Sequence, residues 1–374
     1  MKIMTILGTR PEIIRLSCVI RLLDQFCEHV LVHTGQNYDD RLSRIFFQEL
    51  EMRLPDENMA VCGTGFGTQI GQILKKSEDL FLKHRPDRLL ILGDTNSGIA
   101  AIVAKRMGIP VYHMEAGNRC YDDRVSEEVN RRVIDHTSTI LLPYTNNSKE
   151  NLLREGIPNH RIYVTGNPIK QVIEYYAEKI AASKVLTKMK LKPGRYFLAT
   201  FHRAENVDRE DRLRSLVEGL VDLYREYSFP IICSLHPRTR SKIERFDINI
   251  DQAGLQFVEP LGFLDFVHLE QQAFCLLSDS GTVQEEGCIF GVPNITLRDV
   301  TERPETMECG SNILSGVASA DILQSVYIVM RQTRGWKPPR EYVAPFVAET
   351  VVRILNSYRT QDPSEIEWQL GCRL

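Results

Sequence analysis

Short apolar runs alternate along the chain with longer segments in which apolar residues recur every three or four positions. Pro11–Phe26 is a segment of the second kind and predicts a helix. Short apolar runs separated by helical patterns are typical of parallel sheets covered by helices. The pattern predicts strands in KIMTIL, HVLVHTG, RLLILGD, PVYHME, TILLPY and RIYVTG of the first half, and in YFLATFH, PIICSLH, LQFVEP, AFCLLSD and PNITLRD of the second.

A break in this pattern divides the chain into two halves. Gly166, Asn167 and Pro168 interrupt it before a long polar helix. The chain of 374 residues is too long for most single cores, and each half has the size of a Rossmann domain. We therefore predict an N-terminal domain over residues 1–168 and a C-terminal domain over residues 169–356. The end of the chain, helical in pattern from about Ala348, is compatible with packing on either domain.

The composition is that of a globular protein, with 43% hydrophobic and 25% charged residues. A net charge of −3 argues against nucleic acid or an anionic membrane as a partner, but not against a local basic pocket for phosphate. The apolar core of MKIMTILGTRP is shorter than that of a signal peptide, and no run reaches membrane-spanning length. Nine scattered cysteines without a CxxC pair fit free thiols in a reducing cytoplasm, where we expect the protein to reside.

Polar, small or charged residues follow nearly every predicted strand. Ligands of open α/β sheets bind at the carboxyl ends of the strands, so these residues are the first candidates for a site. Turn chemistry alone explains Gly166-Asn167, but it explains poorly two histidines, an arginine and a glutamate. The positions are Gly8-Thr9-Arg10, Gly35-Gln36, Gly93-Asp94-Thr95-Asn96, Glu115-Ala116-Gly117, Gly166-Asn167, His202-Arg203, His236-Pro237 and Asp279-Ser280-Gly281.

Three of these positions have features of an anion site. Ser280 and Gly281 open a predicted helix whose free N–H groups suit a diphosphate, although a plain helix cap is the alternative. Glu285 or Glu286, one turn further on, is placed to accept from paired ribose hydroxyls. Arg10 precedes a helix N-terminus, where its charge and the dipole repel each other unless an anion lies between them; an arginine extended into solvent is the alternative.

Carboxylates form the second candidate group. Asp94 and Glu115 end successive strands around one predicted helix, so a βαβ unit brings them to the same edge of a sheet. Carboxylates gathered in this way suit proton transfer near neutral pH. For Glu127, in SEEVNRR, the residues alone favour a helix start with Ser126 as a cap over a catalytic role.

Neither a metal ion nor a nicotinamide cofactor is expected. The chain has no HExxH, no DxD pair and no cluster of cysteine and histidine. GTGFGTQIG (Gly63 to Gly71) is not a GxGxxG motif after a strand, and its glycines predict a mobile loop instead.

The motifs GTRPEIIR, GDTNS, HMEAGNR, EEVNRR, FHRAEN, SDSGTVQEE and TERPE, over essentially the whole chain, resemble the non-hydrolysing UDP-N-acetylglucosamine 2-epimerases. TRPEIIRLS, HTGQNYD, EAGNRCYD and HPRTR are most similar to the branch that converts UDP-2-acetamido-2,6-dideoxy-L-talose to UDP-N-acetyl-L-fucosamine for capsule or O-antigen synthesis. The resemblance implies a GT-B-like α/β fold, with two Rossmann-like doubly wound parallel-sheet domains facing a cleft. It also implies that a C-terminal helix, residues 357–374, joins the first domain, and that the protein is a cytoplasmic homodimer acting on a UDP-2-acetamido sugar without a cofactor.

Site residues carry over by position. The resemblance implies a catalytic group of Asp94, Glu115, Glu127 and His202. It implies substrate and UDP contacts for Arg10, Arg15, Gln36, Arg131, Arg203, His236, Phe266, Ser280, Gly281, Glu286 and Arg303, with Phe266 near the uracil. The chain departs from the better-known enzymes in having Arg15 in place of lysine and Ser126 in place of proline.

The expected chemistry follows from the substrate. C2 of a 2-acetamido sugar carries no carbonyl, so its proton is not acidic enough for simple enolisation. Elimination of UDP across C1–C2 to a glycal, then re-addition with a proton on the other face, is the accessible route. Inversion needs a base and an acid on opposite faces, hence more than one carboxylate. The alternatives are the same reaction on UDP-N-acetylglucosamine, a GT-B glycosyltransferase, and a catalytically idle UDP-sugar sensor.

Overall fold

The computed structural model describes residues 1–35, 40–63, 65–251, 254–332 and 335–357. Gln36 therefore lies outside the described residues, as does the expected helix 357–374 apart from its first residue. The elements divide into two units. The first consists of Met1–Tyr175 with Arg340–Leu374, and the second of Tyr176–Pro339.

The described part of the first unit contains a six-stranded parallel sheet in the order β3-β2-β1-β4-β5-β6. Its central strands are Ile-, Leu- and Val-rich because helices cover both faces of a parallel sheet. Met4 and Ile6 of β1 pack with Ile73 and Phe81 in one buried cluster. The strands are β1 (Lys2–Leu7), β2 (Glu28–His33), β3 (Glu57–Asn58), β4 (Arg88–Leu92), β5 (Val111–Met114) and β6 (Ile140–Leu142).

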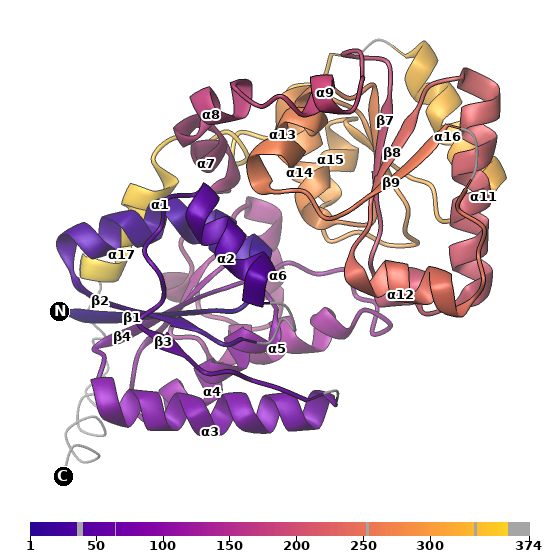
Figure 1. Ribbon diagram of the computed structural model, residues 1–374. Helices are drawn as coiled ribbons and strands as arrows, with labels where there is room; N and C mark the ends of the chain where they lie inside the picture. The colour runs from indigo at the N-terminus through magenta and orange to yellow at the C-terminus, as the bar shows by residue number, and fades with distance from the viewer. Residues whose placement is uncertain (36–39, 64, 252–253, 333–334, 358–374) are drawn as a thin grey trace. The chain divides into compact units, whose positions relative to one another are not determined.

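Helices lie on both faces of this sheet (Figure 1). On one face α1 (Arg10–Phe26) packs against α7 (Ile169–Tyr175) and α17 (Val347–Ser357). On the other face α3 (Phe66–His84) packs against α4 (Ala100–Arg106). The remaining helices of the unit are α2 (Asp40–Glu49), η1 (Asn96–Ile99), α5 (Ser126–Thr137), α6 (Asn146–Arg154) and η2 (Asn159–Arg161).

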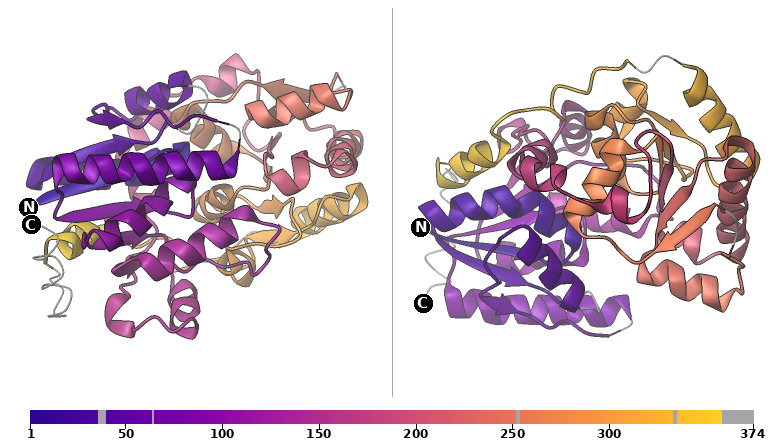
Figure 2. Two further views of the ribbon diagram at one scale, coloured as in Figure 1. Left: turned by 90° about the horizontal axis from the view of Figure 1, so that it is seen from below. Right: turned by 45° about the horizontal axis from the view of Figure 1, so that its top comes forward.

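The division between the units follows helix packing and differs from the boundaries expected at residues 168 and 357. Because α7 packs on α1, it belongs to the first unit, and the second unit begins at Tyr176. The chain returns to the first unit at Arg340, where the backbone N–H of Asn167 donates to the carbonyl of Glu341 (2.9 Å). The right-hand view of Figure 2 shows α17 next to α1.

The second unit repeats the architecture, with a six-stranded parallel sheet among its described residues in the order β12-β11-β10-β7-β8-β9. Alternate residues of β7 face different helices: Phe197 packs in one buried cluster and Leu198 in another. The strands are β7 (Phe197–Thr200), β8 (Ile231–Ser234), β9 (Leu255–Val258), β10 (Cys275–Ser278), β11 (Asn294–Thr296) and β12 (Asn312–Leu314).

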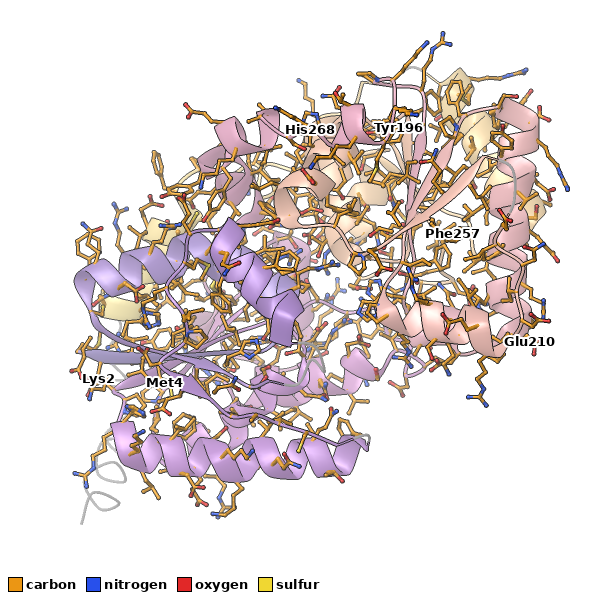
Figure 3. All side chains as sticks on the ribbon, viewed as in Figure 1. Lys2, Met4, Tyr196, Glu210, Phe257 and His268 are labelled. Carbon is orange, nitrogen blue, oxygen red and sulfur yellow. The ribbon has the colours of Figure 1, made fainter. Side chains whose placement is uncertain are left out.

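Two helix layers cover this second sheet. On one face α11 (Glu210–Tyr227) and α16 (Ser319–Arg331) lie side by side, and on the other α13 (Phe263–Gln272) packs against α14 (Gly281–Phe290) (Figure 1). Figure 3 shows side chains filling the layers, with Glu210 at the rim. The remaining helices are α8 (Ala177–Ala181), α9 (Val185–Lys188), α10 (Ala204–Val207), α12 (Pro237–Arg245) and α15 (Pro304–Glu308).

The structure differs from the predicted elements in three places. RIYVTG forms only an isolated parallel bridge between Leu141 and Ile162, and Gly166, at φ +88°, then turns the chain away. β3 and β12, with two and three residues, were not predicted because neither lies in an apolar run. The loop predicted for GTGFGTQIG is wrong from Phe66 on, because α3 begins there and Gly67 and Gly71 lie within that helix. Among the described helices, none has the length and apolar character needed to span a membrane.

Candidate functional site

Two carboxylates leave neighbouring strands of the first unit. β4 and β5 are adjacent, with Leu92 opposite Met114, so Asp94 and Glu115 follow their ends as the βαβ argument predicts. Glu115 has a left-handed backbone (φ +63°), a conformation that costs about 1 kcal/mol for a residue with a Cβ. Strain of this kind is retained where surrounding contacts over-determine the residue.

Glu115 is held by two side chains. Nη1 of Arg15 lies 2.8 Å from its Oε2, and Nδ2 of Asn118 donates to its Oε1 at 3.2 Å. The Arg15 guanidinium is 2% exposed and also lies over the ring of Tyr144, with its Cζ 5.5 Å from the centroid. The buried cation therefore comes from α1, beneath a carboxylate that stays partly exposed.

Asp94 has the same kind of support from another helix. Arg131, on α5, donates from Nη2 to Oδ2 of Asp94 at 2.7 Å and from Nε at 3.2 Å. Its remaining nitrogen, Nη1, lies 2.6 Å from Oε2 of Glu128. The Arg131 side chain is 2% exposed and that of Asp94 is 27% exposed. Each of the two acids thus rests on a buried arginine.

The two glutamates at the start of α5 have different roles. Glu128 is fully buried and accepts the N–H groups of Cys120 and Tyr121, both at 3.2 Å. Burial raises its pKa, but Arg131 and these N–H groups outweigh burial and hold the pKa below its usual range. Glu127 is partly exposed and accepts the hydroxyl of Ser126 at 3.0 Å. Glu128 therefore anchors the loop after β5, and the partly exposed carboxylate is that of Glu127.

Ser126 does not cap α5. It is the first residue of the helix, and the N-cap is Val125, which has no side-chain acceptor. The expected cap was wrong because α5 begins one residue earlier than predicted, so Ser126 is already helical, and its hydroxyl donates to Glu127.

A buried network beneath the two strand exits was missed from the sequence. His113 contacts Asp135 through Nδ1 and the carbonyl of Gly93 through Nε2, both at 2.8 Å. Asp135 also accepts the N–H of Gly117 at 3.2 Å and pairs with Arg119 at 2.8 Å. Burial raises the pKa of Asp135, but His113 and Arg119 outweigh it and hold that pKa below its usual range. No spacing along the chain signals this link between Gly93 and Gly117.

Glu12 is a second residue that sequence reasoning missed. Its Oε2 accepts the N–H groups of Gly8 (3.1 Å) and Thr9 (2.7 Å) and the Thr9 hydroxyl (2.7 Å). Its Oε1 accepts the hydroxyl of Thr95 at 3.2 Å. Burial raises the pKa of Glu12 to about 7, despite these hydrogen bonds. The Thr9 and Glu12 spacing is that of a capping box, so a signal was present.

In the second unit, a buried acid organises the basic residues. Asp279, directly after β10, is fully buried and accepts the N–H groups of His202 (3.0 Å) and Arg203 (2.9 Å) and Nδ2 of Asn206 (3.1 Å). Burial raises the pKa of Asp279, although these donors oppose the shift. The rings of His202 and His236 lie 5.6 Å apart, so the two predicted histidines come together.

The start of α14 lies among paired charges. Ser280 is its N-cap, with no side-chain cap bond, and a Cβ on Gly281 would lie 3.5 Å from Cζ of Arg303. Of the two glutamates predicted to accept from ribose hydroxyls, Glu285 forms an ion pair with Arg303. Glu286, on the same helix, is 4% exposed. The arrangement gathers Ser280, Gly281 and Arg303 at one helix end.

A second ion pair of this unit holds Arg203. Its Nη2 lies 3.3 Å from Oε1 of Glu302, whose other oxygen pairs with Arg298 at 2.7 Å. Both Glu302 and Arg298 are buried, whereas the Arg203 side chain is 15% exposed. Of the three linked side chains, Arg298, Glu302 and Arg203, the most exposed one is therefore a cation.

The other predicted residues have varied surroundings. Arg10 is exposed and is the first residue of α1, with its Cζ 5.7 Å from the centroid of the Phe46 ring. His236 is the N-cap of α12 and accepts the N–H of Arg238 at 3.2 Å, which is a structural role. Phe266 is partly buried against an apolar cluster. In the described part of the chain, no three or more His, Cys, Asp or Glu residues gather in a way that could hold a metal ion.

Known proteins resemble this chain over nearly its whole length. A family model described as UDP-N-acetylglucosamine 2-epimerase matches residues 23–356. The UDP-N-acetylglucosamine 2-epimerase of Methanocaldococcus jannaschii is 42% identical over 364 residues, 95% of this chain and 99% of that protein. The UDP-2,3-diacetamido-2,3-dideoxy-D-glucuronate 2-epimerase of Pseudomonas aeruginosa is 37% identical over 338 residues, 89% of this chain and 93% of that protein.

Solved structures agree with the fold. A crystal structure of the M. jannaschii enzyme in complex with UDP-GlcNAc and UDP has a TM-score of 0.91 at 41% identity, covering 96% of this chain and 100% of that one. The UDP-N-acetylglucosamine 2-epimerase of Rickettsia bellii has a TM-score of 0.88 at 39% identity, covering 96% of each chain. The predicted α/β fold, GT-B-like with two Rossmann-like parallel sheets, is confirmed.

Proposed function

This chain belongs to the UDP-N-acetylglucosamine 2-epimerase family, and from that premise we propose that it inverts C2 of a UDP-2-acetamido sugar by eliminating UDP and adding it back. The enzyme is a UDP-sugar 2-epimerase. The observation that carries the mechanism is the pair of partly exposed carboxylates, Asp94 and Glu115, each held by a buried arginine at neighbouring strand ends.

The first unit supplies the proton transfers in this proposal. Abstraction of the C2 proton and its return on the opposite face need two acid–base groups, and Asp94, Glu115 and Glu127 are the candidates. Arg15 and Arg131 fix the orientation of two of them, because a guanidinium held by burial donates in a fixed geometry. A glycosyltransferase has no need for such a set, so this grouping disfavours that alternative.

The second unit supplies stabilisation of the departing diphosphate. His202, Arg203, Arg303 and the Ser280-Gly281 end of α14 are the groups that we assign to it. Preorganised donors of this kind contribute about 3 kcal/mol each to the transition state. Arg10, Gln36, His236, Phe266 and Glu286 remain proposed substrate or UDP contacts.

For the sugar, we propose UDP-2-acetamido-2,6-dideoxy-L-talose, converted to UDP-N-acetyl-L-fucosamine in capsule or O-antigen synthesis. The support is the resemblance of TRPEIIRLS, HTGQNYD, EAGNRCYD and HPRTR to that branch. UDP-N-acetylglucosamine is the second candidate, because it is named in the relative that is 42% identical. Elimination and re-addition involve no hydride transfer, so we also propose that the enzyme needs no nicotinamide. We propose that it needs no metal either, because the chain has no HExxH, no DxD pair and no cluster of cysteine and histidine.

The test is incubation of each candidate UDP-sugar in D2O, with C2–H followed by proton NMR. We expect deuterium at C2 with the UDP-sugar retained, and the faster exchange with the L-talo sugar. Faster exchange with UDP-N-acetylglucosamine would reassign the substrate. Release of UDP and free sugar, or no exchange with any candidate, would overturn the proposed reaction.

Cytoplasmic location and a homodimer are proposals from the family resemblance. Light scattering after size exclusion measures the mass of the purified protein, for which we expect twice that of one chain. Activity retained after dialysis against EDTA, with no nicotinamide added, is the expected result for the cofactor proposal. A monomer would contradict the proposed homodimer. A loss of activity that is restored by adding a metal ion or a nicotinamide would contradict the cofactor proposal.

A further inference from the structure

Glu12 joins two turns that are far apart in the sequence. One carboxyl oxygen holds the turn after β1 through three donors of Gly8 and Thr9. The other oxygen accepts the Thr95 hydroxyl at 3.2 Å. Thr95 follows Asp94 directly, and its own hydroxyl oxygen accepts the N–H of Ser97 at 3.3 Å. A single buried side chain therefore sets the backbone on the carboxyl-terminal side of Asp94.

The same helix also reaches the second strand exit. Arg15 lies one turn after Glu12 on α1 and pairs with Glu115 at 2.8 Å. Glu12 is 1% exposed and Arg15 is 1% exposed, so solvent does not compete for either contact. α1 thus contacts the turn after Asp94 through the Glu12 carboxylate, and it contacts Glu115 through the Arg15 guanidinium. A shift of the first two turns of α1 would therefore displace both strand-end carboxylates.

We infer that Glu12 is a positioning residue for the epimerase, which holds Asp94 in its reactive orientation through the Thr95 hydroxyl. This role rests on the proposed function, since it matters only if Asp94 takes part in proton transfer. Glu12 itself lies beneath the surface and is assigned no proton transfer to or from the sugar.

The energetics separate this role from plain stabilisation. Burial raises the pKa of Glu12 to about 7, so near neutral pH an ionised Glu12 costs the fold stability. A glutamine of the same shape is uncharged and avoids this cost, although one of its two ends donates instead of accepting. The carboxylate is the one group that accepts from both turns at once, which an amide does not do.

The experiment compares Glu12→Gln, Thr95→Val, Thr95→Ser and the double variant Glu12→Gln/Thr95→Val. Each is assayed for kcat and KM of C2 exchange, for UDP affinity, and for Tm at pH 8. We expect Glu12→Gln and Thr95→Val to lower kcat by about 10²-fold, the effect of a small misplacement, with KM and UDP affinity within about threefold of wild type. Thr95→Ser keeps the hydroxyl and should restore most of kcat.

The double variant distinguishes a shared path from two separate defects. If Glu12 acts through Thr95, the double variant should lose no more kcat than the more impaired single variant. Independent defects would instead multiply. Multiplied losses, a Glu12→Gln variant with the kcat of wild type, or a Thr95→Ser variant as impaired as Thr95→Val would overturn the positioning role. A wild-type enzyme without C2 exchange would instead overturn the proposed function, so the two failures are distinguishable.

Discussion

The two units share one topology but arrange charge in opposite ways. At the ends of β4 and β5 in the first, a buried cation holds a partly exposed acid: Arg131 is 2% exposed and its partner Asp94 is 27% exposed. After β10 in the second, a buried acid holds a partly exposed basic residue: Asp279 is fully buried, whereas the side chain of His202 is 32% exposed. The carboxyl ends of one sheet therefore present acids, and those of the other present bases.

This difference shows how one fold provides two kinds of chemistry. In a pair of charged side chains, the buried one fixes the orientation of the exposed one. The sign of the exposed charge then decides how that side chain acts on a ligand. Exposed acids suit proton transfer, and exposed bases suit a diphosphate.

The largest effect is expected from the loss of a buried cation in the first unit. Arg131→Ala leaves Glu128 buried without its closest cation, and breaking a buried pair costs about 4 kcal/mol. Urea unfolding measures this cost. The matched control is Arg132→Ala, because Arg132 contacts the same Glu128 at 3.2 Å but is 39% exposed, and it should cost less than 1 kcal/mol. Equal costs for the two variants would contradict the assignment of the buried cation.

In the second unit, the loss of a buried acid should have the next largest effect. Asp279→Asn turns an amide N–H toward donors of His202 or Arg203, and an unmatched buried donor costs about 3 kcal/mol. The same change should weaken UDP binding, measured by calorimetry, because both basic residues lose their support. Asp299→Asn is the control: this acid is 35% exposed and its loss should change stability by less than 1 kcal/mol. An Asp279→Asn protein as stable as wild type would remove the buried acid from the comparison.

Glu127 and Glu128 give a comparison within one helix. Glu128→Gln should cost about 2 kcal/mol, since it removes the charge from a buried ion pair and replaces one of the two oxygens that accept backbone N–H groups. Glu127→Gln should change the unfolding free energy little but lower the C2 exchange rate by at least 10²-fold. Chemical unfolding and NMR exchange measure the two effects. The reverse result, with Glu127→Gln unstable and Glu128→Gln inactive but stable, would exchange their roles.

The smallest effect over any single pH unit is a pH dependence of stability due to Glu12. Its pKa is raised from 4.5 to about 7 in the folded protein, so its contribution is fully present below about pH 4.5 and is lost as pH rises through 7. Glu12→Gln lacks this titration. The unfolding free energy of wild type minus that of the variant should fall between these pH values by at most about 1.4 kcal/mol per unit. A difference that stays flat or rises with pH would contradict the raised pKa.

Much of the fold was readable because parallel sheets leave strong apolar runs. The strand-end rule also predicted that Asp94 and Glu115 share one edge of a sheet and that His202 and His236 each follow a strand, but not that the two histidine rings lie close together. β3 and β12 were missed because Glu57-Asn58 is polar and Asn312–Leu314 has only two apolar residues, whereas the equally short β6 lies within the apolar run TILLPY.

The supporting residues of the site were harder to predict than the exposed ones. Glu12 had a local signal in its capping box, but its contact with Thr95 joins positions 83 residues apart. His113 and Asp135 lie on β5 and α5, and only the packing of those elements brings them together. Such contacts depend on register and helix orientation, which composition and spacing do not specify. Asp279 was visible at a strand end, but its burial was not.

The division of labour between exposed acids and exposed bases is tested most directly by two variants and two readouts. Asp94→Asn and Arg203→Gln are each assayed for UDP affinity by calorimetry and for C2 exchange in D2O at saturating UDP-sugar. Asp94→Asn should lose exchange by at least about 10³-fold and keep UDP affinity within about threefold, whereas Arg203→Gln should weaken UDP binding at least about tenfold and, because a donor to the departing diphosphate is lost, also slow exchange at saturation by about 10²-fold. Loss of both properties to the same extent in both variants, or the reverse pattern, would contradict the account.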